Sequence, residues 1–191
     1  MEALAYQDEY QEYELINGEV YMMARPSINH IRIEKNIIKA FDRYLQGKKC
    51  EAFFEPNVRL SEKDQFIPDV IIVCNPDIGK DDGIYGAPDL VVEVLSPSTA
   101  RNDKLRKKAL YEKYGVKEYW IVDPINKSIE VYHLVEGKLV LENVCMMYRD
   151  YEWERMTEEE RELAQKEQLS IQVSLYDDFT IDIAEVFRGV N

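Results

Sequence analysis

The sequence of 191 residues has few of the residue types that build metal-rich or disulfide-rich proteins. Its three cysteines are Cys50, Cys74 and Cys145, and its two histidines are His30 and His133. Three widely spaced cysteines match neither a disulfide framework nor the paired spacing of a zinc site. Two histidines are too few for a histidine-based metal centre unless carboxylates complete it. We therefore expect no disulfide framework, and a metal site would need acidic ligands.

Long hydrophobic runs and targeting signals are also missing. No stretch approaches the length of a membrane span, and the first residues show no basic region followed by an apolar one. Gly-rich phosphate-binding loops are absent too, which argues against nucleotide-dependent kinases and dehydrogenases. From these absences we expect a cytoplasmic protein that has no contact with membranes.

Positive charge is in deficit. The chain carries 24 Lys+Arg against 37 Asp+Glu, a net charge of −13, while 46% of its residues are hydrophobic. This balance argues against a protein that coats nucleic acid by bulk electrostatics, although it permits a local basic groove. The length and the hydrophobic content fit one domain spanning residues 1–191.

The pattern along the chain contains both strands and helices, and its apolar strands are typical of a sheet that is covered by helices. A charged segment at about 147–168 interrupts this pattern, and we interpret it as a solvated, inserted helix in preference to a binding element. The predicted elements are a hairpin over 13–23, a helix from Ser27 to about Gln46, strands over 51–60, 66–74, 89–95 and 118–122, a basic helix over 102–114, and a hairpin over 128–134 and 139–145.

Two acids occupy positions where burial is expected. Glu93 lies in the apolar run 90–95, and Asp69 directly precedes the apolar run 70–73. A charge inside a strand that is buried on both faces costs several kcal/mol unless a partner, a proton or a metal compensates it. Acids on two neighbouring core strands therefore indicate a functional site.

Each predicted helix adds an inward polar residue. On the first helix, Glu34 falls within the apolar arc, either as a structural acid satisfied by a nearby donor or as a third acid of the site. His30 lies one turn earlier, and we interpret it as a core histidine hydrogen-bonded near the helix start. On the second helix, Lys107 shares a face with Asp103 and Tyr111. It pairs either with Asp103 alone or, as we favour, with the acids of the sheet.

Carboxylates and a lysine, without histidine or cysteine ligands, suit one chemistry best. Magnesium prefers carboxylate oxygens, and a divalent ion can neutralise a phosphate and activate a bound water. A nearby lysine can orient that water or stabilise the transition state. The set of residues therefore favours metal-assisted hydrolysis of a phosphodiester bond.

Four motifs carry a family resemblance. They are YELINGEVYMMA over 13–24, PDV over 68–70, APDLVVEVLSPST over 87–99 and GVKEYWIVDP over 115–124. Together with the spacing of Asp103, Lys107 and Tyr111, they resemble the Uma-two-type family of restriction-endonuclease-like proteins, a former domain of unknown function within the PD-(D/E)XK nuclease superfamily. The resemblance covers about residues 13–134. It implies an α/β (α+β) fold, with a central mixed sheet flanked by helices and additional β-hairpins. It also implies a magnesium-dependent DNA endonuclease in which manganese can replace magnesium.

The resemblance also implies roles for individual residues. Asp69 and Glu93 would be the metal-binding acids, with the carbonyl of Val94 as a further ligand, and Glu34 would support the site. The superfamily's usual lysine, two residues after the second acid, is replaced by Leu95. The resemblance assigns that role to Lys107, which the helix pattern selects independently.

Three alternatives stay open at this point. Asp89 is the alternative acid, although its place at the mouth of a strand favours a capping role. The missing lysine and the net charge of −13 are compatible with a catalytically inactive nuclease-like module that binds a partner. The third alternative is a nuclease that acts on RNA or on recombination intermediates, which the sequence does not separate from a DNA endonuclease. A homodimer is also expected by analogy with superfamily members that cut two strands.

Overall fold

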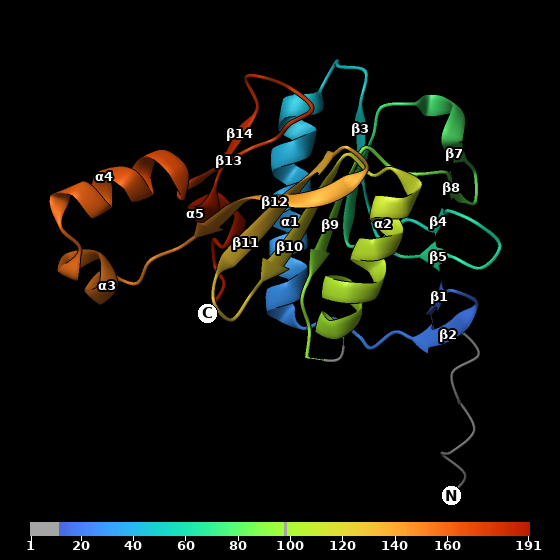
Figure 1. The fold of residues 1–191 in the computed structure, drawn as a ribbon, viewed down its shortest axis with the longest axis horizontal. Coiled ribbons are helices and arrows are strands. Elements are labelled where there is room, and N and C mark those ends of the chain that lie inside the picture. The colour runs from blue at the N-terminus through green and yellow to red at the C-terminus, as the bar shows by residue number, and fades with distance from the viewer. Residues whose placement is uncertain (1–11, 98) are drawn as a thin grey trace, which may run out of the picture.

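The structure is a computed structural model that describes residues 12–97 and 99–191. Its centre is a six-stranded mixed sheet in the order β12-β11-β10-β9-β6-β3 (Figure 1). The pairing of β9 with β10 is parallel, and the other pairings in this sheet are antiparallel. The bounds of its strands are β3 Glu51–Phe54, β6 Val70–Val73, β9 Leu90–Val94, β10 Glu118–Asp123, β11 Ser128–Val135 and β12 Lys138–Met146.

Helices cover the two faces of this sheet, as the apolar strands require. Helix α1 (Ile28–Leu45) packs Ile33 and Ile37 against one face. On the other face lies a helix that begins with a π-helical turn, η2 (Asn102–Lys107), and continues as α2 (Lys108–Tyr114). Because side chains alternate along a strand, Val92 and Val94 face α1, whereas Val91 packs on the α2 side. The predicted mixed sheet flanked by helices is confirmed.

A second sheet of short strands extends from the α2 side. Its order is β2-β1-β5-β4-β8-β7. The bounds are β1 Tyr13–Ile16, β2 Glu19–Met22, β4 Val58–Arg59, β5 Gln65–Phe66, β7 Gly79–Lys80 and β8 Gly83–Tyr85, with the 3₁₀ turn η1 Pro76–Ile78 before β7. The β1–β2 turn has positive φ at Asn17 and Gly18, as the hairpin prediction requires. This sheet brings β1 next to η2, where it contributes to the site.

Two expected elements differ in detail. The strand expected over 51–60 is divided into β3 and β4, because the backbone turns at Glu55, which has a φ of 48°. The helix expected over 102–114 begins with the π-helical turn instead of a regular α-helix. The expected ends of the helices are confirmed, since the Ser27 side chain caps α1 and Gly115 ends α2 with a φ of 85°.

The cysteine prediction was wrong at one pair. Cys50 and Cys74 form a disulfide across a sequence separation of 24 residues, and Cys145 is a buried free thiol. The register of β3 on β6 pairs Glu51 with Val73, which places the two flanking cysteines opposite each other. Sequence spacing alone cannot show that register.

The charged segment near the C-terminus forms two helices, α3 (Asp150–Arg155) and α4 (Glu158–Glu167), instead of the one expected. Met156 ends the first helix, and the side chain of Thr157 caps the second. Figure 1 shows both helices projecting beyond the β12 edge of the sheet. The chain then returns as β13 (Ser170–Gln172), β14 (Thr180–Asp182) and α5 (Ile183–Val186). Among the described residues, no helix is both long and apolar enough to cross a membrane.

Candidate functional site

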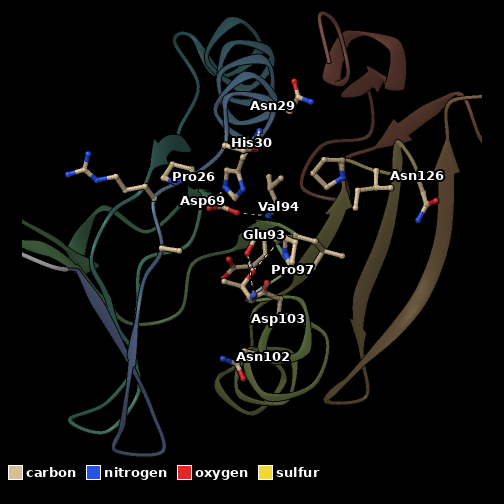
Figure 2. A pocket seen from close by; sticks show the side chains of 18 of the residues that line it. Pro26, Asn29, His30, Asp69, Glu93, Val94, Pro97, Asn102, Asp103 and Asn126 are labelled. Atoms are coloured by element: carbon tan, nitrogen blue, oxygen red, sulfur yellow. Dashed lines mark hydrogen bonds and ion pairs between the residues drawn. The ribbon is translucent and has the colours of Figure 1, made fainter. Parts of the chain in front are cut away.

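The candidate site is a cavity of about 960 Å³ at one end of the central sheet (Figure 2). Its polar wall contains acids from β1, β6, β9 and η2, together with His30 and Lys107. Four connecting segments form much of the rest of the lining: residues 22–26, 95–97, 124–127 and 147–150. Loops on a rigid sheet thus surround a group of ionisable side chains, an arrangement typical of a ligand site.

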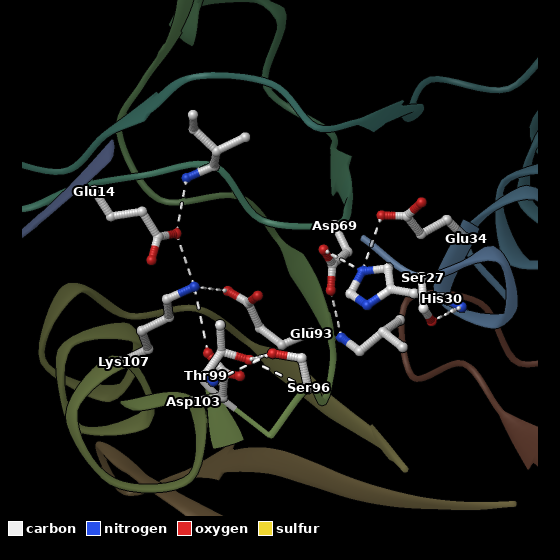
Figure 3. Close-up of polar contacts among 12 residues, drawn as sticks. Glu14, Ser27, His30, Glu34, Asp69, Glu93, Ser96, Thr99, Asp103 and Lys107 are labelled. Carbon is white, nitrogen blue, oxygen red and sulfur yellow. Dashed lines mark hydrogen bonds and ion pairs between the residues drawn. The ribbon is translucent and has the colours of Figure 1, made fainter. Parts of the chain in front are cut away.

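Lys107 is the centre of one buried cluster, the Lys107 cluster, which Figure 3 shows beside β9. Its Nζ lies 2.7 Å from Glu14 Oε1, 3.2 Å from Glu93 Oε1 and 3.3 Å from Asp103 Oδ1. The Tyr111 hydroxyl donates a 2.7 Å hydrogen bond to the same oxygen of Glu93. One lysine therefore faces three carboxylates in the interior of the protein.

The alternation of β9 explains this contact. Val92 and Val94 pack under α1, so Glu93 between them faces η2 and α2. Asp103 and Lys107 lie four residues apart on the turn above it, and both are buried. Burying the charged Glu93 carboxylate without a partner would be strongly unfavourable, and the ammonium group of Lys107 offsets this desolvation cost.

The charges in the Lys107 cluster shift one another's protonation. Burial alone lowers the pKa of Lys107, but the charges of Glu93, Glu14 and Asp103 outweigh it and hold that pKa well above its usual value. Burial raises the pKa of Glu93 well above its usual value, and Lys107 offsets only part of the rise. Lys107 is therefore an ammonium at neutral pH and acts as a fixed positive charge.

A second group, the His30 cluster, consists of His30, Glu34 and Asp69. His30 Nε2 lies 3.0 Å from Asp69 Oδ1 and 3.2 Å from Glu34 Oε1. Burial lowers the pKa of His30, but contacts with the two carboxylates outweigh it and raise that pKa to about 10. Burial raises the pKa of Glu34, and His30 offsets part of this rise. The cluster is thus a buried set of one nitrogen and two carboxylate ligands.

Asp69 connects the two clusters. Its Oδ1 faces His30, and its Oδ2 accepts a hydrogen bond from the backbone N–H of Val94, the residue after Glu93 (Figure 3). Asp69 directly precedes β6, whose pairing with β9 is antiparallel. The two acids that the sequence singled out therefore come from neighbouring strands, as expected.

The structure distributes the expected site residues over both clusters. Glu93 and Lys107 belong to the Lys107 cluster, and Glu34 and Asp69 belong to the His30 cluster. Val94 follows Glu93 and donates its backbone N–H to Asp69. Lys107 contacts Glu93 as well as Asp103, so both pairings considered from the sequence are present.

Asp89 lies away from both clusters. Its carboxylate accepts hydrogen bonds from the backbone N–H of Cys74 and from Lys117 Nζ, each at 2.7 Å. These contacts tie the strand ends together, which matches the capping role expected for this residue.

The predictions from the sequence missed two contacts of the site. Glu14 is buried, contacts Lys107 and accepts a 3.1 Å hydrogen bond from Ile67 N–H. The signal for it was the alternation within β1, since Glu14 lies two residues before the buried Ile16. His30 was interpreted as a core histidine hydrogen-bonded near the helix start, and its link across to Asp69 on the sheet was not predicted.

Comparison with known proteins first defines the fold. The chain superposes on a crystal structure from Anabaena variabilis described as "a putative nuclease belonging to DUF820". The TM-score is 0.68 at 17% sequence identity, and the superposition covers 92% of this chain and 89% of that one. At this identity the match establishes a common fold.

Sequence comparison then identifies the family. The Uma2 family, described as "Putative restriction endonuclease", matches residues 1–176, and the chain belongs to it. Two uncharacterized proteins of Synechocystis sp. are also similar. Protein slr1290 is 31% identical over 126 residues, which are 64% of this chain and 66% of that protein. Protein sll1609 is 28% identical over 131 residues, 65% of this chain and 73% of that protein.

Proposed function

We propose that the protein is a metal-dependent endonuclease that hydrolyses phosphodiester bonds of DNA. The observation that carries the proposal is the position of Asp69, Glu93 and Lys107 in the lining of one cavity, each buried and each within a network of polar contacts. Membership of the Uma2 family supports a nuclease. The fold shared with the Anabaena protein supports the same class.

The donor set fits a hard divalent cation, with Mg²⁺ as the natural ion and Mn²⁺ as a substitute. We propose that Asp69 and Glu93 hold it, assisted by the carbonyl of Val94. A bound cation of this kind would neutralise charge on the phosphate and lower the pKa of a water. The chemistry of the donor set supports a cation here, because Asp69 and Glu93 are buried carboxylates in the wall of one cavity.

The protein's own groups would do the remaining work. Lys107 Nζ, kept charged by its three carboxylate neighbours, would orient the attacking water or stabilise charge on the phosphate. Glu14 and Asp103 would retain Lys107 when Glu93 turns to the cation, because both lie within 3.3 Å of its Nζ. Glu34 would support the site from α1.

A plasmid-nicking assay tests the proposal. Purified protein should nick DNA with Mg²⁺ or Mn²⁺, and should not do so with Ca²⁺ or a chelator. Glu93→Gln and Lys107→Ala should each lower the cleavage rate by about 100-fold or more, in line with the loss of a charged group at a transition state. Glu93→Gln is nearly isosteric, and thermal melting should verify that each variant is folded.

Lys104→Ala is the matched control for Lys107. Lys104 lies in the same turn, but its side chain is exposed and pairs with Glu130. This variant should cleave at the wild-type rate. Unchanged cleavage in both Glu93→Gln and Lys107→Ala would refute the proposed site.

A second candidate function is an inactive nuclease-like module that binds a partner. The contacts of Glu93 favour it, because Lys107 and Tyr111 already occupy the oxygen that a cation would need. Calorimetric titration with Mg²⁺ and Mn²⁺ separates the two candidates. The nuclease should bind at least one of these ions at millimolar concentration or below, with weaker binding in Glu93→Gln, and the inactive module should show no binding that depends on Glu93.

A further inference from the structure

We propose that the His30 cluster is a second metal position, separate from the one between Asp69 and Glu93, and that it takes a first-row transition-metal dication such as Mn²⁺. Its ligands would be His30 Nε2, Glu34 Oε1 and Asp69 Oδ1. The inference rests on the proposed function only in that both place a cation in the same cavity. Binding at this position can be measured without any cleavage.

The geometry supplies the first argument. The three ligand atoms all lie within 4.8 Å of one another, and they come from two elements that pack together. His30 and Glu34 are four residues apart on α1, so their side chains project from the same face of the helix. Asp69 approaches from the start of β6 (Figure 3). His30 and Asp69 are in the wall of the cavity, and Glu34 contacts His30.

The hydrogen bonding supplies an independent argument. His30 Nε2 carries at most one proton, yet it faces two carboxylate oxygens, at 3.0 and 3.2 Å. This proton is in the hydrogen bond with Asp69, so Glu34 Oε1 accepts no hydrogen bond from the described residues. Glu34 is 94% buried, since only 6% of its surface is exposed. A cation in place of the proton would contact all three atoms at once and would satisfy the remaining oxygen.

The ligand types determine the class of metal. Imidazole nitrogen favours first-row transition metals, whereas Mg²⁺ and Ca²⁺ prefer oxygen ligands alone. Two carboxylates with one neutral imidazole carry a charge of about −2 and balance a dication. Glu93 is held by Lys107 and Tyr111 on the α2 side of the sheet, so this nitrogen-containing position does not depend on it.

Pulsed electron paramagnetic resonance of bound Mn²⁺ tests the proposal, because it detects ¹⁴N nuclei of directly coordinated imidazole. The untagged chain is well suited to the measurement, since it contains only two histidines. His133 is the matched control: it lies on β11 opposite Glu118, outside the cavity lining. Variants His30→Gln, His133→Gln and Glu93→Gln would be compared with the wild type.

We expect a ¹⁴N coupling in the wild type, in His133→Gln and in Glu93→Gln, and no such coupling in His30→Gln. His30→Gln should also weaken Mn²⁺ binding by about tenfold or more. Mn²⁺ binding without nitrogen coupling, coupling that survives in His30→Gln, or no binding of Mn²⁺ at all would each overturn the proposal. Nicking of DNA without nitrogen coupling would support the nuclease proposal and contradict the metal position at His30. Nitrogen coupling without nicking would support the metal position and contradict the nuclease proposal.

Discussion

Two buried glutamates in neighbouring strands show how differently one residue type can be used. Glu93 in β9 contacts a lysine and lines the cavity. Glu118, at the start of β10, is fully buried and receives hydrogen bonds from Trp120 Nε1 at 2.6 Å and from Ser174 N–H at 2.8 Å. Its donors come from its own strand and from the C-terminal region. We therefore assign Glu118 a structural role.

Glu118→Gln should lower the free energy of unfolding by about 1–3 kcal/mol. The amide offers one acceptor oxygen, so its NH₂ group would face one of the N–H donors that the carboxylate now accepts. Urea denaturation measures the loss, and Mn²⁺ binding and DNA nicking should stay unchanged. The exposed Glu142→Gln on β12 is the control and should stay within about 0.5 kcal/mol of the wild type. An unchanged stability of Glu118→Gln would contradict the structural role.

The sequence singled out residues of the cavity wherever a polar side chain interrupts a strong apolar pattern. Asp69, Glu93 and Lys107 interrupt such patterns, and all three line the cavity. Glu14 was missed because β1 has only four residues and alternates between buried and more exposed positions. Glu118 directly precedes the apolar run 119–122, just as Asp69 precedes 70–73, so the pattern alone cannot separate a structural acid from a candidate catalytic one.

At the scale of elements, Asp64 holds three of them together. Its carboxylate accepts hydrogen bonds from Asn17 N–H at 2.8 Å, from Tyr114 Oη at 2.7 Å and from Ser61 Oγ at 3.1 Å. These donors belong to the β1–β2 turn, the end of α2 and the β4–β5 turn. The hairpin that carries Glu14 is thereby fixed relative to the helix that carries Lys107.

The contacts of Asp64 predict a pH dependence. Burial acts to raise its pKa, but the hydrogen bonds from Tyr114, Asn17 and Ser61 outweigh it, so the folded-state pKa lies below the usual value. A lowered folded-state pKa gives stability that is present above the unfolded-state pKa of about 3.9 and is lost as the pH falls through the folded-state pKa. Asp64→Asn should cost about 1–3 kcal/mol at neutral pH. The difference from the wild type should shrink below about pH 4.

Urea denaturation at a series of pH values checks this expectation. The control is Asp81→Asn, an exposed substitution between β7 and β8, which should change stability little at any pH. A difference between Asp64→Asn and the wild type that stays constant as the pH falls would contradict the assigned role.

The order of the elements was predictable because most of them have a clear hydrophobic period. The pairing of the strands was less predictable. The register of β3 on β6, which joins Cys50 to Cys74, depends on contacts between remote segments. The π-helical turn at Asn102–Lys107 also has no signal in a wheel of 3.6 residues per turn. Local patterns thus predict elements, while pairing and helix irregularity depend on packing.

At the scale of the whole molecule, residues 151–167 form an acidic excursion, a segment of the chain that projects from the central sheet and returns to it. The chain leaves and returns at one place, because Met146 N–H donates to the carbonyl of Gln168 at 3.1 Å. Within α3 and α4, only Ala164 is buried. The excursion has seven acidic and three basic side chains, so its removal would change the formal net charge from −13 to −9.

Replacing 151–167 by a short Gly-Ser linker should therefore leave the rest of the protein folded and its Mn²⁺ affinity unchanged, since the ligands of the proposed sites and the cavity-lining residues 147–150 lie outside the replaced segment. At an ionic strength of about 0.01 M, the affinity for a labelled DNA oligonucleotide should rise, because unscreened acidic groups repel phosphates over about 30 Å. At about 0.15 M, where screening acts within about 8 Å, the gain should largely disappear.

Fluorescence anisotropy at the two ionic strengths distinguishes this long-range effect from direct contact. A variant that keeps the excursion but carries Glu158→Gln, Glu159→Gln and Glu162→Gln on α4 is the matched control, because it removes charge without removing chain. Both variants should show the same direction of change. Weaker DNA binding by the excised chain, together with unchanged or stronger binding by the charge variant, would instead mean that α3 and α4 contact the DNA through groups other than these carboxylates.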